Sequence, residues 1–134
     1  PSGFTNVFNT PVGGSGAAPI FPGESYSFSF SAEDGDKLSF ATMLVQSNDW
    51  FIAANGMNLY SGGNAVTGDV TSSLKLYDAG TEVDEYAGAG ANQAPRQSGA
   101  DTGADESGNA MEEVEASSNV PSISNMIKVT ISAN

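Results

Sequence analysis

The chain of 134 residues carries 16 acidic side chains against 4 basic ones and no His, so its formal net charge is −12 at pH 7. This balance excludes nucleic acid as a partner and argues against an anionic membrane surface, because both are bound through clusters of Lys and Arg. The absence of His and Cys removes the commonest general base and the thiol nucleophile, and we expect no enzyme activity.

The length predicts a single domain over residues 1–134, since it is close to the commonest domain size. Sixteen Gly residues disfavour long helices, and short strands joined by turns fit this composition better. No apolar run approaches the roughly 18 residues of a spanning helix, so we expect no membrane insertion. The first residue is Pro1 rather than Met, which predicts a removed leader or a longer parent chain.

The first third of the chain combines flexible and strand-like segments. Residues 1–19 are rich in Gly, Pro, Ser and Asn, and with the short apolar stretch Phe4–Phe8 they indicate an N-terminal arm or an edge strand. Ser25–Ser31 places an aromatic side chain at every second position, between serines. This alternation predicts a half-buried strand whose aromatic residues face the core; they are Tyr26, Phe28 and Phe30.

A central hydrophobic region follows. Leu38–Val45 is an almost continuous apolar run, which predicts a central strand. The polar residues Ser47-Asn48-Asp49 interrupt it before the apolar sequence resumes at Trp50–Ala53. Asn55-Gly56 is a dipeptide typical of a tight turn.

The second half of the chain adds two more expected strands. Val70–Tyr77 alternates in hydrophobicity and Met126–Ser132 is rich in β-branched residues, so both are predicted strands. Between them, residues 84–121 predict a long acidic loop that wraps the domain. No helical periodicity persists for three turns. The pattern therefore predicts an all-β fold, an antiparallel β-sandwich.

Carboxylates stand at the ends of two of the predicted strands. Asp49 lies in the break before Trp50, and Asp78 and Glu82 follow the strand Val70–Tyr77. Gly80 allows the backbone between Asp78 and Glu82 to turn tightly, so both side chains can be aimed at one point. Calcium binds through several carboxylate oxygens in a flexible geometry. These residues therefore predict one calcium site at a loop end of the domain.

The spacing leaves an alternative open. Asp-x-Gly-x-Glu does not match an EF-hand loop, and an Asp turn followed by a solvated Glu explains Asp78–Glu82 equally well.

Two segments carry a resemblance to a known family. LSFATMLVQSNDWFIAANGMNLY (Leu38–Tyr60) and LKLYDAGTEVDEYAGAGANQAPRQSG (Leu74–Gly99) resemble the spondin N-terminal domain, most closely its bacterial members. The resemblance implies a C2-like antiparallel β-sandwich that binds one Ca²⁺, with the metal-binding carboxylates at Asp49, Asp78 and Glu82.

The resemblance also implies a function. In animal relatives the domain belongs to extracellular matrix and adhesion proteins. We therefore expect a secreted or cell-surface, non-catalytic, calcium-binding adhesion or matrix-type domain. Its expected partner is a protein or a glycan at the cell surface.

One departure from the family pattern suggests an alternative function. The segment upstream of Pro22 lacks the first strand usual in the family, which leaves an open sheet edge. Three outcomes fit this departure: Phe4–Phe8 folds back to fill the edge, it pairs with a neighbouring copy, or the family segment belongs to a part of the protein outside this chain. The second outcome makes the chain a structural subunit of a self-assembling surface fibre or coat, a homo-polymer joined by strand addition.

Overall fold

The structure is a computed structural model that describes residues 6–112 and 120–133. The chain divides into two compact units, Pro1–Ala32 and Glu33–Asn134, which are considered separately. That residues 1–134 fold as one domain stays a prediction. Within the described residues, no helix has the length and apolar character needed to cross a membrane.

The described part of the first unit, residues 6–32, is an irregular loop. It is closed by hydrogen bonds from the Val12 amide to the Ser25 carbonyl (2.8 Å) and from the Tyr26 hydroxyl to the Ala18 carbonyl (2.5 Å). The predicted strand Ser25–Ser31 is wrong, because this segment is part of no strand ladder. Alternating sequence alone forms no strand when no neighbouring strand supplies hydrogen bonds.

The aromatic residues of this loop pack on one another rather than in a core. Phe28 stacks on Phe8 with ring centroids 4.3 Å apart and on Phe30 at 5.8 Å. Phe28 and Phe30 remain 41% and 39% exposed, so the prediction that they face the core is wrong. Phe4, in the predicted edge strand Phe4–Phe8, lies outside the described residues, and the described part of that segment is not a strand.

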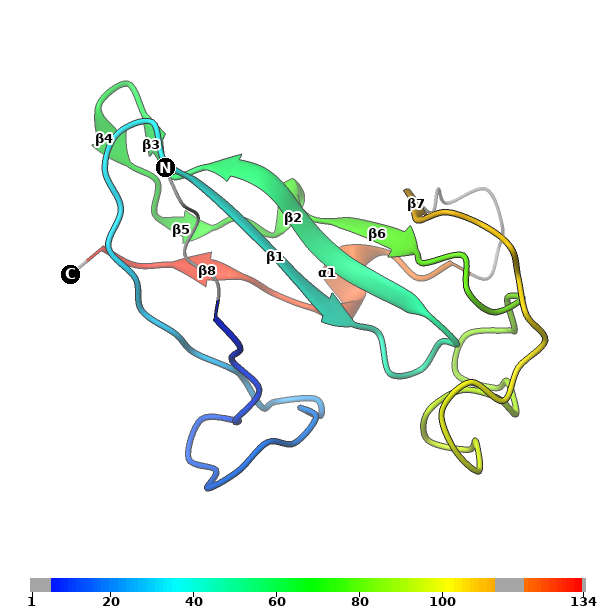
Figure 1. Ribbon diagram of the computed structural model, residues 1–134. Helices are drawn as coiled ribbons and strands as arrows, with labels where there is room; N and C mark the ends of the chain where they lie inside the picture. Colours follow the sequence, from blue (N-terminus) through cyan, green and yellow to red (C-terminus); the bar gives the residue numbers. More distant parts are fainter. Residues whose placement is uncertain (1–5, 113–119, 134) are drawn as a thin grey trace. The chain divides into compact units, whose positions relative to one another are not determined.

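The second unit is built on one antiparallel sheet with strand order β1-β2-β6-β7 (Figure 1). Its strands are β1 (Lys37–Met43), β2 (Trp50–Asn58), β6 (Lys75–Asp78) and β7 (Met111–Glu112). Two smaller antiparallel pairs complete the strands: β3 (Tyr60–Ser61) with β4 (Asn64–Ala65), and β5 (Gly68–Asp69) with β8 (Thr130–Ile131). The prediction of an all-β antiparallel fold is confirmed.

The apolar run Leu38–Val45 does not form a central strand, contrary to the prediction. It overlaps β1, which lies at an edge of the described sheet, while β2 and β6 occupy the middle. Residues of β1 alternate between half-buried and exposed. The run is continuous because its solvent face also carries apolar side chains, among them Met43, which is 48% exposed.

The predicted turn at Asn55-Gly56 is a β-bulge inside β2. The register with β1 shifts between Leu38 and Phe40, so that two residues of β2 oppose Ser39. Gly56 adopts φ +70°, and its amide donates to the Ser39 hydroxyl at 2.9 Å. Glycine accepts this conformation without steric cost, which lets the strand continue through the bulge. The chain reverses later, at Gly62-Gly63 between β3 and β4, where both φ values are positive.

The predicted strand Val70–Tyr77 begins five residues late. Its first part is a 3₁₀ turn, η1 (Thr71–Ser73), and only Lys75–Asp78 is strand. The Asp69 carboxylate accepts the Thr71 amide at 2.9 Å, and hydrogen bonds from the Thr71 side chain and backbone lower the pKa of Asp69 below its ordinary value. This local bond favours a turn over extended backbone.

The predicted strand Met126–Ser132 is also shorter than expected. Its first residue, Met126, is the last residue of a single helical turn, α1 (Ile123–Met126), and only Thr130–Ile131 pairs with β5.

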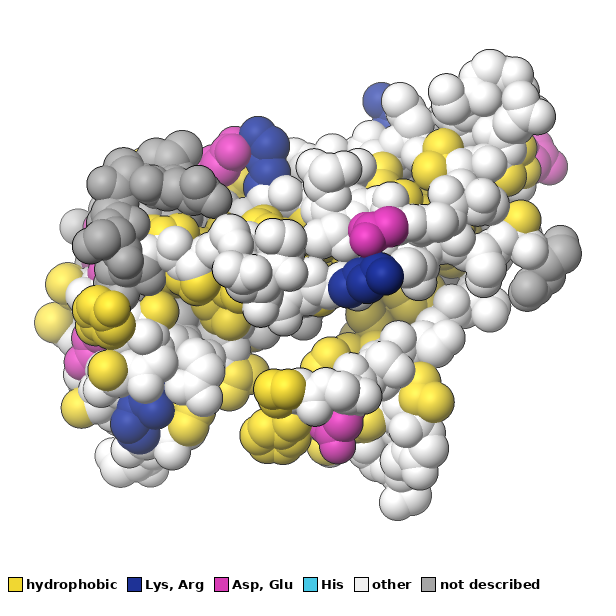
Figure 2. All heavy atoms as spheres, turned by 180° about the vertical axis from the view of Figure 1, so that it is seen from behind, with side chains coloured by type: hydrophobic (Ala, Val, Ile, Leu, Met, Phe, Trp, Pro, Cys, Tyr) yellow, Lys and Arg dark blue, Asp and Glu magenta, His cyan; other side chains and the backbone are white. Residues whose placement is uncertain are grey.

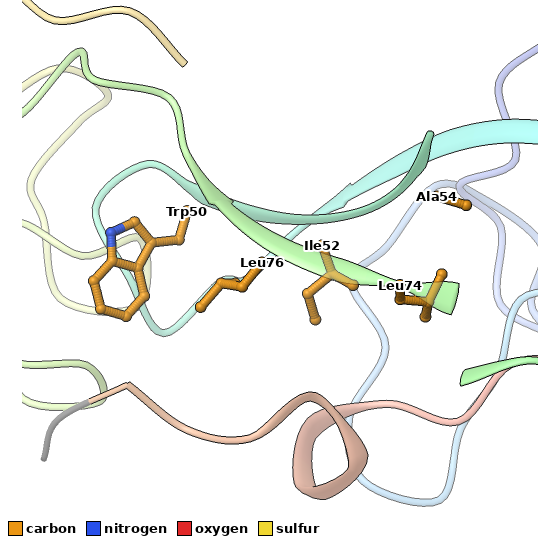
Figure 3. Close-up of a cluster of buried hydrophobic side chains, with 5 residues drawn as sticks. All are labelled: Trp50, Ile52, Ala54, Leu74 and Leu76. Carbon is orange, nitrogen blue, oxygen red and sulfur yellow. The ribbon is translucent and has the colours of Figure 1, made fainter. Parts of the chain in front are cut away.

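The core lies on one face of the main sheet. Five buried side chains from β2, from β6 and from the residue just before β6 point to the same side, toward the segment that carries α1 (Figure 3). They are Trp50, Ile52, Ala54, Leu74 and Leu76, and the half-buried residues packed against them include Val120, Ile123, Met126, Ile127 and Val129. The long segment predicted at 84–121 is irregular up to β7 in its described part. The packing of two sheets into a C2-like sandwich stays a prediction.

Ile52→Ala should destabilise the second unit by about 2–5 kcal/mol, because it leaves a cavity in this core. Met43→Ala, at an exposed position of the neighbouring strand, should change stability by no more than about 0.5 kcal/mol. Urea unfolding followed by the fluorescence of Trp50 measures both. Equal losses for the two variants would show that the core is placed wrongly.

Candidate metal centre

The register of β2 and β6 brings two of the predicted site residues together. Trp50, the first residue of β2, pairs with Asp78, the last residue of β6. Because the strands are antiparallel, the start of one lies beside the end of the other. Asp49 therefore meets Asp78 at one end of the sheet, as the break in the apolar sequence predicted.

The loop between β1 and β2 is held by Ser47, a fully buried hydroxyl. Ser47 Oγ donates to the Leu44 carbonyl at 2.6 Å and accepts the Trp50 amide at 3.0 Å. The Leu44 amide donates to the Trp50 carbonyl at 2.9 Å, which closes the loop. These bonds fix the backbone on both sides of Asn48 and Asp49.

The segment after β6 folds around the Asp49 carboxylate. Asp78 Oδ1 accepts the Gly80 amide at 2.7 Å, which starts the turn. Asp49 Oδ2 then accepts the amide and the hydroxyl of Thr81, both at 2.7 Å, and the amide of Glu82 at 3.1 Å. The two strand ends are thus joined by three hydrogen bonds to one carboxylate oxygen.

Gly80 is required at its position for two reasons. Its φ of +69° is unfavourable for other residues, and a Cβ there would lie 3.0 Å from the backbone of Gly108 and Asn109. The Gly108 amide donates to the Gly80 carbonyl at 3.0 Å, so residues 104–109 run directly against the turn.

Three carboxylates converge at this end of the sheet. Asp49, Asp78 and Asp84 each offer an oxygen, and these oxygens lie within 4.8 Å of one another. Calcium–oxygen distances are about 2.3–2.6 Å, so oxygens on opposite sides of a calcium ion are about 5 Å apart. The spacing of the three oxygens therefore fits a single calcium ion.

Asp84 was missed in the sequence. Its position two residues after Glu82 was the one feature of the sequence that could have indicated a further ligand. Asp84 Oδ1 accepts the indole Nε1–H of Trp50 at 2.5 Å. A buried core residue therefore orients this carboxylate, and the long sequence separation conceals the contact.

Glu82, the third predicted ligand, is not in this group. Its side chain is only 5% exposed, and its Oε1 accepts the Gly103 amide at 3.0 Å. Its backbone forms an isolated bridge with Asp105. Glu82 thus lies between the carboxylate group and the segment 103–105.

Buried polar atoms without partners lie beside the carboxylates. Within the described residues, Asp49 Oδ1 and both side-chain atoms of Asn48 make no hydrogen bond, and Asn48 is only 7% exposed. A buried polar atom left unpaired costs about 1–3 kcal/mol. The two ion pairs of the described residues, Lys75–Glu112 and Lys128–Asp69, involve none of these groups. A bound cation would satisfy the Asp49 oxygen and offset the charge, so the residues present fit a calcium ion.

Comparison with known proteins identifies the family. The spondin N-terminal domain model (Spondin_N) matches residues 16–100, a range that contains Asp49, Asp78, Glu82 and Asp84. No curated protein and no solved structure matches the chain significantly. Domains of this family are typically extracellular, are of a matrix or adhesion type, and are not known as catalytic. Because the match covers more than half of the 134 residues, the chain belongs to the spondin N-terminal domain family.

Proposed function

We propose that this chain is a non-catalytic adhesion or matrix-type domain in which one calcium ion fastens the loops at one end of the main sheet. The observation that carries the proposal is the convergence of three carboxylate oxygens within 4.8 Å, one of them from Asp49, whose Oδ1 has no hydrogen-bond partner among the described residues. Its expected partner is a protein or a glycan at the cell surface.

The proposed ligands are Asp49, Asp78 and Asp84. Glu82 supports them indirectly, because its carboxylate holds Gly103 while its amide binds Asp49. Without a cation, three carboxylates at this spacing repel one another. A bound calcium ion attracts all three carboxylates and so offsets their mutual repulsion. The ion would then join the β1–β2 loop to the segment after β6. The role of the metal is therefore to stiffen a binding or assembly surface.

Calcium should raise the melting temperature of the chain by several degrees, because a ligand that binds only the folded state stabilises it. Asp78→Asn and Asp84→Asn should each remove most of this rise, whereas Glu82→Gln should retain part of it. Asp34→Asn, which removes a charge from an exposed turn, is the matched control and should keep the full rise. Differential scanning calorimetry with calcium and with a chelator measures the effect. A folded wild-type chain without any calcium-dependent shift would refute the site.

Gly103→Ala should weaken calcium binding. A Cβ at this position would lie 3.1 Å from Glu82 Cδ and 3.2 Å from Asn48 Nδ2, so both side chains beside the proposed site would have to shift. Gly99→Ala, in the same loop, meets no atom within 4 Å and should leave binding unchanged. Isothermal titration calorimetry compares the two, and equal affinities would place Glu82 and Asn48 outside the influence of the ion.

A second candidate function is self-assembly by strand addition. In the described sheet, β1 is an edge strand, and its exposed face carries Ala41 and Met43. An open edge strand presents backbone donors and acceptors to another strand. This observation supports a subunit that joins copies of itself into a fibre or coat.

Light scattering of the full chain over a concentration series, with calcium and with a chelator, tests this second candidate. Assembly predicts masses that rise in multiples of 13.6 kDa. A constant mass of one chain at every concentration would leave only the adhesion or matrix-type domain.

A further inference from the structure

A second contact joins the two ligand-bearing segments without any metal. The loop of residues 85–97 directly follows Asp84, and it folds around Gln93, which is completely buried. Gln93 Nε2 donates to the Tyr86 carbonyl at 2.8 Å, and Gln93 Oε1 accepts the Gly88 amide at 3.1 Å. This side chain thus satisfies backbone groups inside the loop and sets its shape.

Arg96 closes the same loop from its other end. Its Nε donates to the Gly90 carbonyl at 2.7 Å, and its Nη2 donates to Gln93 Oε1 at 2.5 Å. Glu85 fills the remaining space, because a Cβ on Gly90 would collide with it. Glu85 Oε2 accepts the Asn92 amide at 2.9 Å, and Glu85 Oε1 accepts Asn92 Nδ2 at 2.8 Å. Both carboxylate oxygens of Glu85 therefore form hydrogen bonds within this loop.

The closed loop then binds Gln46, which lies in the β1–β2 loop three residues before Asp49. The Gly88 amide donates to the Gln46 carbonyl at 2.7 Å, and Arg96 Nη2 donates to Gln46 Oε1 at 3.2 Å. The segment that follows Asp84 is therefore attached to the segment that precedes Asp49. Arg96 supplies the side-chain part of that attachment.

We propose that Arg96 is a positioning residue that sets the calcium affinity of the Asp49, Asp78 and Asp84 group. This inference rests on the proposed function. It adds a residue that contacts none of the proposed ligands but sets the affinity of the site for calcium. By holding the two loops together before the ion arrives, the Arg96–Gln46 contact reduces the ordering that binding requires. Groups that hydrogen-bond to the metal ligands themselves typically change metal affinity by about 10–100-fold. Arg96 acts one contact further from the ion, through Gln46, so we expect a change at the lower end of this range.

The charge of Arg96 and its positioning role affect calcium affinity in opposite directions. A positive charge opposes calcium binding by Coulomb repulsion to an extent that falls with distance, so removal of the Arg96 charge alone should leave binding unchanged or strengthen it. Loss of positioning should weaken binding instead. Basic side chains are few in this chain and lie apart from one another on the face shown in Figure 2, so neutralising one changes a single local charge. The direction of the change in affinity therefore separates the two effects.

The test is a calcium titration by isothermal calorimetry on the full chain and three variants. Arg96→Ala should raise the dissociation constant about tenfold, and Gln46→Met, which changes no charge, should raise it in the same direction. Lys128→Ala, which removes a positive charge from an exposed pair with Asp69, should leave it unchanged or slightly lower. Melting temperatures in chelator show how far each variant is destabilised without calcium.

Calcium affinity that is unchanged or stronger in folded Arg96→Ala and Gln46→Met overturns the inference and leaves the calcium site standing. If Arg96→Ala does not fold, Gln46→Met decides alone, because it keeps Arg96 and Gln93 in place. A wild-type chain that binds no calcium overturns the proposed function and the inference with it.

Discussion

The pairing of Trp50 with Asp78 is the constraint on which the rest of the site depends. It brings the start of β2 beside the end of β6, so Asp49 and Asp78 share one end of the sheet. It also leaves the indole of Trp50 within hydrogen-bonding distance of Asp84. A shift of this pairing by one residue would turn the buried side chains of one strand, such as Leu76 of β6, away from the core, so the packing that stabilises the sheet also fixes the carboxylates.

Features that depend on local sequence patterns, such as the fold class and the position of strand ends, could be predicted from the sequence. The all-β class followed from short apolar runs, and the polar break at Ser47–Asp49 indicated that Asp49 lies at a strand end beside Asp78, as the strand register shows. Asp84 was missed because its orientation comes from Trp50, 34 positions away. Asn55-Gly56 predicts a turn from sequence, but tight turns and β-bulges both use a glycine with positive φ, and the structure has a bulge here. Ser25–Ser31 was predicted wrongly for a different reason. Alternating hydrophobicity shows which side chains of a strand would share a face, but it does not show whether a partner strand is present to form hydrogen bonds.

The acidic character of the chain and the geometry of the carboxylate group both support the proposed calcium site. A surface with net charge −12 stays hydrated and separate from its neighbours, and it attracts divalent cations. The structure concentrates that charge where backbone amides of Thr81 and Glu82 already bind one Asp49 oxygen and leave the other unpaired. The family is of extracellular matrix or adhesion type, and the proposed site would make loop rigidity in this member depend on calcium.

Terbium luminescence tests the central claim most directly. Terbium replaces calcium in carboxylate sites and emits when a nearby indole transfers energy to it, and Trp50, the single tryptophan, is bonded to the proposed ligand Asp84. The account predicts strong emission on excitation of Trp50, saturating at one terbium per chain and lost when calcium is added. A folded chain without sensitised emission, or emission that Asp49→Asn and Asp84→Asn leave intact, would contradict it.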